Sequence, residues 1–233
     1  MIDFHSHILP KIDDGSRSTD MSLQMIEALA NQGADTIAAT SHFYATERTP
    51  QRFLELREAS WEHLKERLPE GSPQILLGAE VLYFPGISHM DELPLLCLEG
   101  TKLLLLEMPF SAWTESMIRE VNELARMGSC TLLMAHIERY FFQQPLSVWD
   151  ELLEHGVLMQ ANANFFLPFG TRRKALRLLR EGRIHLLGSD CHSMGSRAPH
   201  LGEAREMIRR SLGQETLDEI DALGRELLAE GRA

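Results

Sequence analysis

The chain has 233 residues, of which 44% are hydrophobic and 24% charged, and its formal net charge at pH 7 is −11. No uncharged apolar stretch is long enough to span a bilayer, and an acidic chain without a basic stripe is poorly suited to capture nucleic acid. The sequence starts without an export signal, and its three cysteines are widely spaced. These features predict one cytoplasmic domain over residues 1–233, with reduced thiols, no integral membrane segment and no nucleic-acid partner.

Short apolar runs alternate with helical patterns along the chain. The first run, residues 1–5, precedes a helical pattern over residues 19–33, with Ser18 or Thr19 as its N-cap and Gly33 as its stop. The later runs cover residues 36–42, 74–81, 101–108, 130–136, 156–164 and 184–190. An amphipathic helix follows at 215–232 and is expected to have one packed and one solvated face, without a functional role. Seven apolar strands separated by helices predict an α/β fold with a parallel sheet, closed as a barrel or doubly wound.

Side chains of metal-ligand type stand at the carboxyl ends of these predicted strands. They are His5, His7, His42, Glu80, Glu107, His136, Asn162, Asn164, Asp190 and His192. Parallel barrels carry their functional groups at this edge. Any one of these residues alone would be read as a surface or hydrogen-bonded side chain. The five other histidines lack this placement, so the joint placement of the first set predicts a metal site.

The spacing inside this set favours several ions. His5 and His7 are two residues apart on one strand, so both imidazoles face the same side. Asp190 and His192 repeat that spacing with mixed ligands. A glutamate such as Glu80 has two oxygens that can bridge two cations. Clustered cations are typical of two-metal and three-metal hydrolases.

The motifs as a set resemble the polymerase-and-histidinol-phosphatase (PHP) superfamily. They are "DFHSH", "TSH", "GAE", "LLLLEMP", "AHIERY" and "GSDCHS", in the order of that family. The continuation "HILPKIDDGSRS" is similar to the bacterial manganese-dependent protein tyrosine phosphatases, which act on tyrosine kinases of capsule and exopolysaccharide synthesis. The resemblance extends from residue 1 to about residue 200.

This resemblance implies a distorted TIM-like (β/α)7 barrel with three divalent metal ions. The implied ligands are His5, His7, Glu80 and Asp190 for the first ion, Asp14, His42 and His192 for the second, and Glu80, Glu107 and His136 for the third. Imidazole and carboxylate ligands without thiolate favour manganese, with iron or zinc as alternatives. A metal-bridged hydroxide would attack the phosphate, and Arg139 and Arg197 would hold the phosphoryl oxygens. For Arg197 a surface salt bridge remains an equal alternative.

Three functions remain open at this point. The first is hydrolysis of phosphotyrosine on a protein, such as a bacterial tyrosine kinase. The second is a small-molecule phosphatase of the histidinol-phosphate type, and the third is a non-catalytic metal-binding scaffold. The segment from Cys191 to Arg197 has the C-x5-R spacing of cysteine-dependent phosphatases, but Asp190 beside the thiol opposes its ionisation, and the thiol is expected to point away from the site.

Aromatic residues gather in the loops that follow the second, third, fifth and sixth strands. The sequence predicts that they form an apolar rim for a phenyl phosphate ring. The residues are Phe43, Tyr44, Tyr83, Phe84, Tyr140, Phe141, Phe142, Phe165, Phe166 and Phe169.

Overall fold

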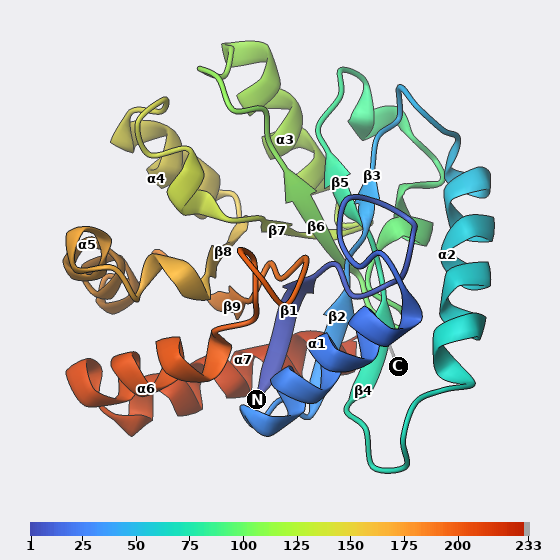
Figure 1. The fold of residues 1–233 in the computed structure, drawn as a ribbon. Helices are drawn as coiled ribbons and strands as arrows, with labels where there is room; N and C mark the ends of the chain where they lie inside the picture. Colours follow the sequence, from blue (N-terminus) through green and yellow to red (C-terminus); the bar gives the residue numbers. More distant parts are fainter. Residues whose placement is uncertain (231–233) are drawn as a thin grey trace.

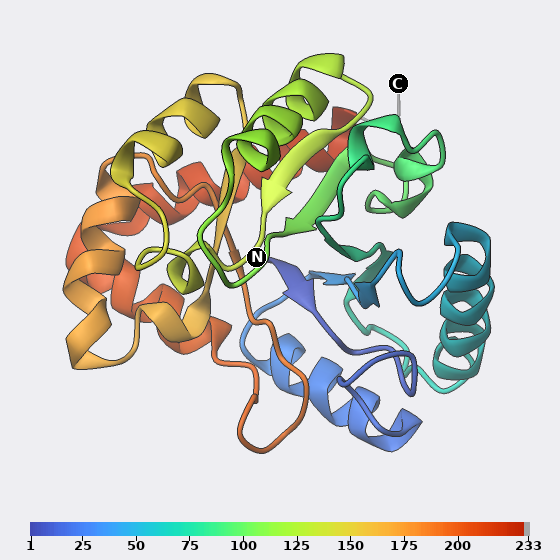
Figure 2. The ribbon, with the colours of Figure 1, turned by 90° about the horizontal axis from the view of Figure 1, so that it is seen from above.

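The computed structural model describes residues 1–230 and contains nine parallel strand segments with helices around them (Figures 1 and 2). One sheet has the order β1-β2-β4, and the other has the order β3-β5-β6-β7-β8-β9. The strands are β1 (Ile2–Ser6), β2 (Thr36–Ala39), β3 (His42–Phe43), β4 (Gln74–Leu77), β5 (Glu80–Leu82), β6 (Leu103–Glu107), β7 (Thr131–Met134), β8 (Leu158–Asn162) and β9 (Leu186–Gly188). A parallel bridge from Ser6 to Cys191 joins β1 to the segment after β9, so the two curled sheets meet along that side. The predicted distorted (β/α)7 barrel is confirmed.

Two of the predicted strands are each divided in the structure. The run 36–42 forms β2 and β3, and the run 74–81 forms β4 and β5, with the second member of each pair belonging to the other sheet. At the second break, a Cβ on Gly78 would lie 2.5 Å from a methyl carbon of Leu98, so a side chain there would displace that methyl group. These breaks distort the barrel and start a new strand at His42 and at Glu80.

Seven α-helices surround or close the barrel. They are α1 (Thr19–Asn31), α2 (Pro50–Lys65), α3 (Glu115–Met127), α4 (Leu146–Glu154), α5 (Phe169–Arg180), α6 (Leu201–Leu212) and α7 (Gln214–Ala229). Short 3₁₀ turns lie at Ile87–His89, Leu93–Leu96, Ile137–Arg139 and Ala163–Phe165. Ser18 caps α1, since its side chain accepts a hydrogen bond from Met21 N. Among the described residues no helix is both long and apolar enough to cross a membrane.

The core has an outer and an inner layer. The outer layer packs the strands against the helices, and its buried residues include Leu104 of β6 and Met25 of α1. The inner layer fills the barrel with Phe4, Leu105 and neighbouring side chains, and Leu227 of α7 closes it near the amino ends of the strands. This placement confirms a packing role for the last predicted helix, whose residues after 230 lie outside the described part.

Candidate metal centre

All nine predicted metal-ligand residues meet at the carboxyl edge of the barrel. Glu80, at the start of β5, lies at the middle of the group. Its Oε2 is 3.2 Å from Nε2 of both His5 and His7, and its Oε1 is 2.8 Å from Nε2 of His136. Asp190 Oδ1 lies 3.6 Å from the Nε2 atoms of the same two strand histidines. One carboxylate therefore faces three imidazoles that come from two strand ends.

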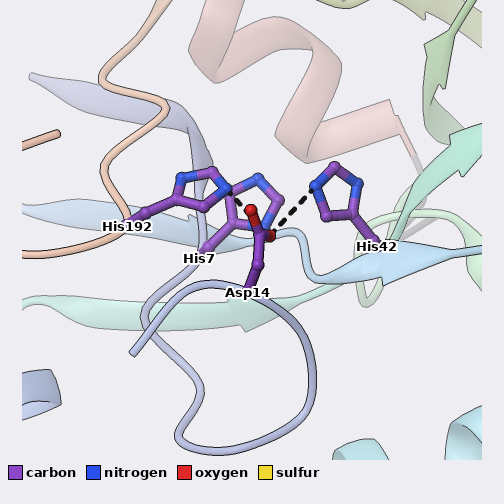
Figure 3. A group of neighbouring side chains, drawn as sticks. All are labelled: His7, Asp14, His42 and His192. Atoms are coloured by element: carbon purple, nitrogen blue, oxygen red, sulfur yellow. Dashed lines mark ion pairs between the residues drawn. The ribbon is translucent and has the colours of Figure 1, made fainter. Parts of the chain in front are cut away.

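Asp14 lies between two imidazoles of a second group, those of His42 and His192 (Figure 3). Its Oδ1 is 3.4 Å from Nε2 of His42 and 3.3 Å from Nε2 of His192. Together with the ring of His7, these side chains form a group whose ligand atoms all lie within 4.8 Å of one another. Asp14 comes from the loop after β1, so this group combines three separate parts of the chain.

The third group shares a histidine with the second. Glu107, the last residue of β6, has one oxygen 3.4 Å from His136 Nε2 and the other 3.8 Å from His42 Nδ1. His42 Nδ1 is also 3.0 Å from Glu80 Oε2. The ring of His42 thus lies between Asp14 on one edge and Glu80 with Glu107 on the other. The ligand sets implied by the resemblance give His42 to a single ion, whereas the geometry places it between two groups.

An irregularity in β1 aims both strand histidines at the centre. The register of β1 against β2 shifts between Asp3 and Ser6, which means that β1 holds one extra residue there. Phe4 belongs to the inner core, yet the next residue, His5, faces Glu80. The two Nε2 atoms of His5 and His7 are 3.1 Å apart, so the expected common orientation is confirmed. Gly188 of β9 lies directly against His5, where a Cβ would come within 2.5 Å of the His5 Cβ.

His136 and Asp190 have left-handed backbone conformations. Their φ angles are 33° and 51°. Non-glycine residues in this region cost on the order of 1–3 kcal/mol and are often found at functional sites. Each stands two positions after the last residue of a strand, β7 or β9, with its side chain toward Glu80 or the two strand histidines. Sequence patterning gives no signal for this conformation.

A second layer of polar groups orients the imidazoles. Asp13 Oδ2 accepts a hydrogen bond from His7 Nδ1 at 2.8 Å and from the backbone N–H of His42 at 2.9 Å. Gln160 Oε1 lies 3.2 Å from His5 Nδ1 and accepts from His136 N at 2.7 Å. Such partners fix the ring that they contact and raise its basicity as a metal ligand. Sequence reasoning gave neither residue a role, although Asp13 stands beside Asp14.

The electrostatics of the group suit bound cations. Burial alone would lower the pKa of His7, but the carboxylates of Asp13 and Glu80 raise it to about 10. Burial would also lower the pKa of His136, but the carboxylates of Glu107 and Glu80 raise it to about 9. Positive charge is therefore favoured among these closely spaced carboxylates, and divalent cations would supply it.

Unpaired atoms support the same conclusion. His42 Nδ1, Glu80 Oε2, His136 Nδ1 and His192 Nε2 are buried without a hydrogen-bond partner in the described residues. Buried polar atoms usually form hydrogen bonds, so several such atoms without one that converge on one place suit the coordination of cations. The residues therefore fit a cluster of divalent cations, although His136 Nδ1 faces away from Glu80.

Both predicted arginines lie at this site and contact the same carboxylate. Arg139 Nη2 binds Asp190 Oδ2, and Arg197 Nη2 is 2.7 Å from Asp190 Oδ1. Arg197 therefore pairs with a residue of the site instead of forming a remote surface salt bridge. The two arginines line a pocket of about 330 Å³ with Asn162, Asn164 and Thr171, among other residues.

The predicted aromatic rim is largely wrong. Phe43, Tyr83, Tyr140, Phe165 and Phe166 are buried. Their rings pack in the outer core, so their position in loops at the functional edge did not make them accessible. Phe142 and Phe169 are exposed, and Tyr44 stacks on His42 with ring centroids 5.2 Å apart.

Phe110, in the loop after β6, is an aromatic residue of the site that sequence reasoning missed. Its ring centroid lies 5.8 Å from that of His136, and the guanidinium carbon of Arg139 is 5.7 Å from it. The side chain remains 54% exposed. The ring of Phe110 therefore lies beside the metal-ligand residue His136 and has an accessible face.

Cys191 points away from the site, as expected. Its side chain is fully buried in the outer core. Burial, with the charges of Asp3 and Asp190 acting in the same direction, raises the pKa of the thiol far above its ordinary value. A thiol in this state is not a nucleophile at neutral pH.

Comparison with known proteins gives the family. The family model described as "Capsular polysaccharide synthesis, CpsB/CapC" matches residues 1–225. The chain belongs to the CpsB/CapC family. It is 31% identical over 225 residues to the tyrosine-protein phosphatase YwqE of Bacillus subtilis, covering 92% of this chain and 86% of YwqE.

Other CpsB/CapC relatives agree along nearly the whole length. The tyrosine-protein phosphatase CpsB of Streptococcus agalactiae is 29% identical over 233 residues, and 94% of each chain is covered. A solved structure described as YwqE from Bacillus subtilis and CpsB from Streptococcus pneumoniae, "unique metal-dependent tyrosine phosphatases", superposes with a TM-score of 0.84. It is 27% identical and covers 99% of this chain and 95% of its own. The resemblance to bacterial tyrosine phosphatases of PHP type is confirmed.

Proposed function

We propose that this protein is a metal-dependent phosphatase that hydrolyses phosphotyrosine on a protein. The observation that carries the proposal is the convergence of nine imidazole and carboxylate side chains, Glu80 among them, at the carboxyl edge of the barrel, with Arg139 and Arg197 at the same edge. A scaffold without catalysis would not need two arginines beside an open pocket. The names of the CpsB/CapC relatives support the same activity.

The proposed ligands are assigned to three ions. His5, His7, Glu80 and Asp190 hold the first, Asp14, His42 and His192 the second, and Glu80, Glu107 and His136 the third. The mixture of nitrogen and oxygen ligands without sulfur favours manganese, with iron or zinc as alternatives. Such ions polarise phosphoryl oxygens and lower the pKa of water toward neutrality.

The remaining residues bind and orient the substrate in this proposal. Arg139 and Arg197 hold the phosphoryl oxygens, because a planar guanidinium matches two oxygens at once. Both side chains are part-buried and already anchored on Asp190, so they are held near the place where the phosphate would lie. Phe110 stacks on the phenol ring of the substrate, since its open face adjoins His136 and Arg139.

A tyrosine kinase of capsule or exopolysaccharide synthesis is the proposed protein substrate, and the cytoplasm is the proposed location. The family description supports the first assignment, and three free cysteines are consistent with the second. Histidinol phosphate is the main competing substrate. Its cationic amine requires a free anion in the pocket, whereas the lining carboxylate of Asp190 is already paired with Arg139 and Arg197, and burial raises the pKa of the lining residue Glu138 to about 7.

The test is hydrolysis of a phosphotyrosyl peptide after metal removal and reconstitution. Protein treated with a chelator should be inactive, and manganese should restore turnover more effectively than zinc. A phosphoserine peptide and histidinol phosphate are measured in parallel and should have lower kcat/KM values. Full activity in protein shown to be metal-free would refute the metal mechanism. Equal or better turnover of histidinol phosphate would move the assignment to the small-molecule reaction.

A further inference from the structure

Helix α5 carries a concentration of positive charge that the proposed mechanism does not use. Its sequence, FGTRRKALRLLR, contains five cationic residues and no carboxylate, whereas the whole chain has 34 acidic and 23 basic residues. Arg173, Lys174, Arg177 and Arg180 follow one another at spacings of one, three and three residues. Residues three and four apart are neighbours on a helix surface, so these four form one stripe, called here the α5 cationic face.

The α5 cationic face is not neutralised by its surroundings. Within the described residues, neither Arg173 nor Arg180 has a carboxylate at ion-pair distance, and Arg177 has only a long contact, 3.9 Å, to Glu181. The opposite side of the helix is buried through Ala175, Leu178 and Leu179. That apolar side therefore cannot insert into a lipid surface. A partner of the helix would contact mainly its positive charges.

Exposed phenylalanines accompany these charges. Phe142 is 94% and Phe169 is 92% exposed. The ammonium of Lys174 lies 4.0 Å from the ring centroid of Phe141 and 5.5 Å from that of Phe142. The segment between β7 and α4 is therefore packed against α5, and the two present cations and apolar rings together. Such a surface fits a peptide with both carboxylates and apolar side chains.

The α5 cationic face continues from the pocket beside the metal centre. Thr171, in the first turn of α5, lines that pocket together with Asp190 and Arg197. A helix rises about 1.5 Å per residue, so Arg177 lies about 9 Å and Arg180 about 13 Å along the axis from Thr171. An extended peptide advances about 3.3 Å per residue. Positions roughly two to four residues from a phosphotyrosine held in the pocket would reach these arginines.

We infer that the α5 cationic face docks acidic residues that flank the phosphotyrosine of the protein substrate. This inference rests on the proposed phosphatase function and adds a sequence preference to it. The partner is an extended acidic segment, because the charges are arranged in a line that leads away from the pocket.

The experiment compares two phosphotyrosyl peptides that differ only in flanking residues, with three glutamates in one and three glutamines in the other. Several exposed ion pairs together should give the acidic peptide a kcat/KM about 5- to 30-fold higher at low salt, decreasing as salt is added. The readout is the ratio of kcat/KM for the acidic peptide to kcat/KM for the glutamine peptide. A change in activity that affects both peptides equally leaves this ratio unchanged. In the double variant Arg173→Glu, Arg177→Glu the ratio should fall to about one or below.

A matched control places the same charge change elsewhere. Arg209 and Arg210 are exposed on α6, where both pair with Glu206, and the variant Arg209→Glu, Arg210→Glu should keep the wild-type ratio. An equal ratio in wild type and in the α5 variant would overturn the inference. Loss of binding to phosphatidylserine vesicles in the α5 variant, with an unchanged peptide ratio, would assign the face to a membrane and also overturn it.

Failure of the proposed function can be recognised separately. If neither peptide nor a small aryl phosphate is hydrolysed by manganese-loaded protein, the phosphatase assignment is wrong. Fluorescence anisotropy with the same two labelled peptides then still measures docking. Tighter binding of the acidic peptide that is lost in the α5 variant would support the surface, and equal binding would refute it.

Discussion

Asp13 Oδ2 lies 2.8 Å from Nδ1 of His7, and this contact turns Nε2 of the same ring toward Glu80. The same carboxylate oxygen receives the backbone N–H of His42, so one side chain positions two proposed ligands. Removing it should weaken metal binding without removing a ligand. We expect Asp13→Ala to reduce metal affinity about 10- to 100-fold.

Competition with a chromophoric chelator measures this affinity. Asp20→Ala is the control, because Asp20 is an exposed residue of α1 that pairs with Arg67. An unchanged affinity in the Asp13 variant would show that His7 does not need its carboxylate partner.

The Cys191 thiol should be dispensable for turnover. Its pKa is raised by burial, and its side chain belongs to the outer core. Cys191→Ser and Cys191→Ala should therefore keep most activity, whereas His42→Ala should lose orders of magnitude. His63→Ala, at an exposed position of α2, controls for general loss of histidine. Inactive serine and alanine variants with full metal content would restore the cysteine mechanism.

Alanine variants of Phe110 and Phe166 should have different effects, one on substrate binding and the other on stability. Phe110 is 54% exposed beside His136, so Phe110→Ala should raise KM for phosphotyrosyl peptides with little change in kcat. Phe166 is fully buried, and Phe166→Ala should instead cost about 3–5 kcal/mol of unfolding free energy. Steady-state kinetics and urea denaturation distinguish the two outcomes. A KM effect confined to the Phe166 variant would contradict this assignment.

The contact between Tyr83 and Glu120 should make stability depend on pH. Burial acts to raise the pKa of Glu120, but hydrogen bonds from the Tyr83 hydroxyl at 2.6 Å and from Ser88 lower it below 4.5. The stabilisation is therefore complete above pH 4.5 and is lost as the pH falls through the lower folded-state value. Glu120→Gln should cost about 1–2 kcal/mol at pH 7 and progressively less below pH 4.5.

Urea denaturation of metal-free protein at pH 7 and at pH 4 measures this difference. Glu123→Gln, an exposed position on the same helix, should have little effect at either pH. The same cost at both pH values would mean that the ionised form of Glu120 contributes nothing.

Gly224 should be required for packing although it lies inside α7. A Cβ at this position would be 2.9 Å from the Phe4 ring and 3.3 Å from Ile2. Alanine favours a helix over glycine by about 1 kcal/mol, whereas overpacking costs about 1–3 kcal/mol. Gly224→Ala should therefore lower the Tm. Gly170→Ala is the control, since a Cβ there would meet no atom within 4 Å, and it should leave the Tm unchanged or raise it.

The carboxyl edge of the barrel could be predicted from the sequence because parallel strands in a barrel end on one side. That rule placed His42, Glu80 and His136 together without knowledge of their contacts. Alternation alone puts Phe4 and His5 on opposite faces. The extra residue in β1 lets Phe4 pack in the inner core while His5 faces the metal-ligand group. No residue type in the sequence predicts such an irregularity.

The aromatic residues show where sequence reasoning fails. Phe166 and Phe110 both belong to loops at the functional edge, but one ring is buried and the other is open. Their difference arises from packing against helices and neighbouring loops, which depends on distant parts of the chain. The roles of Asp13 and Gln160 likewise depend on contacts to His7 and His5 that only the folded barrel creates.

The seam between β1 and the segment after β9 has a consequence for synthesis on the ribosome. Ser189 N donates to Asp3 Oδ1 at 2.8 Å across 186 residues of sequence, and Asp190 N donates to His5 O at 2.7 Å. At about 5–20 residues per second, His5 and His7 leave the ribosome roughly 10–40 s before Asp190 does. A nascent chain thus exposes two imidazoles long before Asp190 and its partner Arg197 exist. In the proposed centre, Asp190 and His192 are ligands, so complete metal loading would follow their synthesis and a nascent chain would not yet be active.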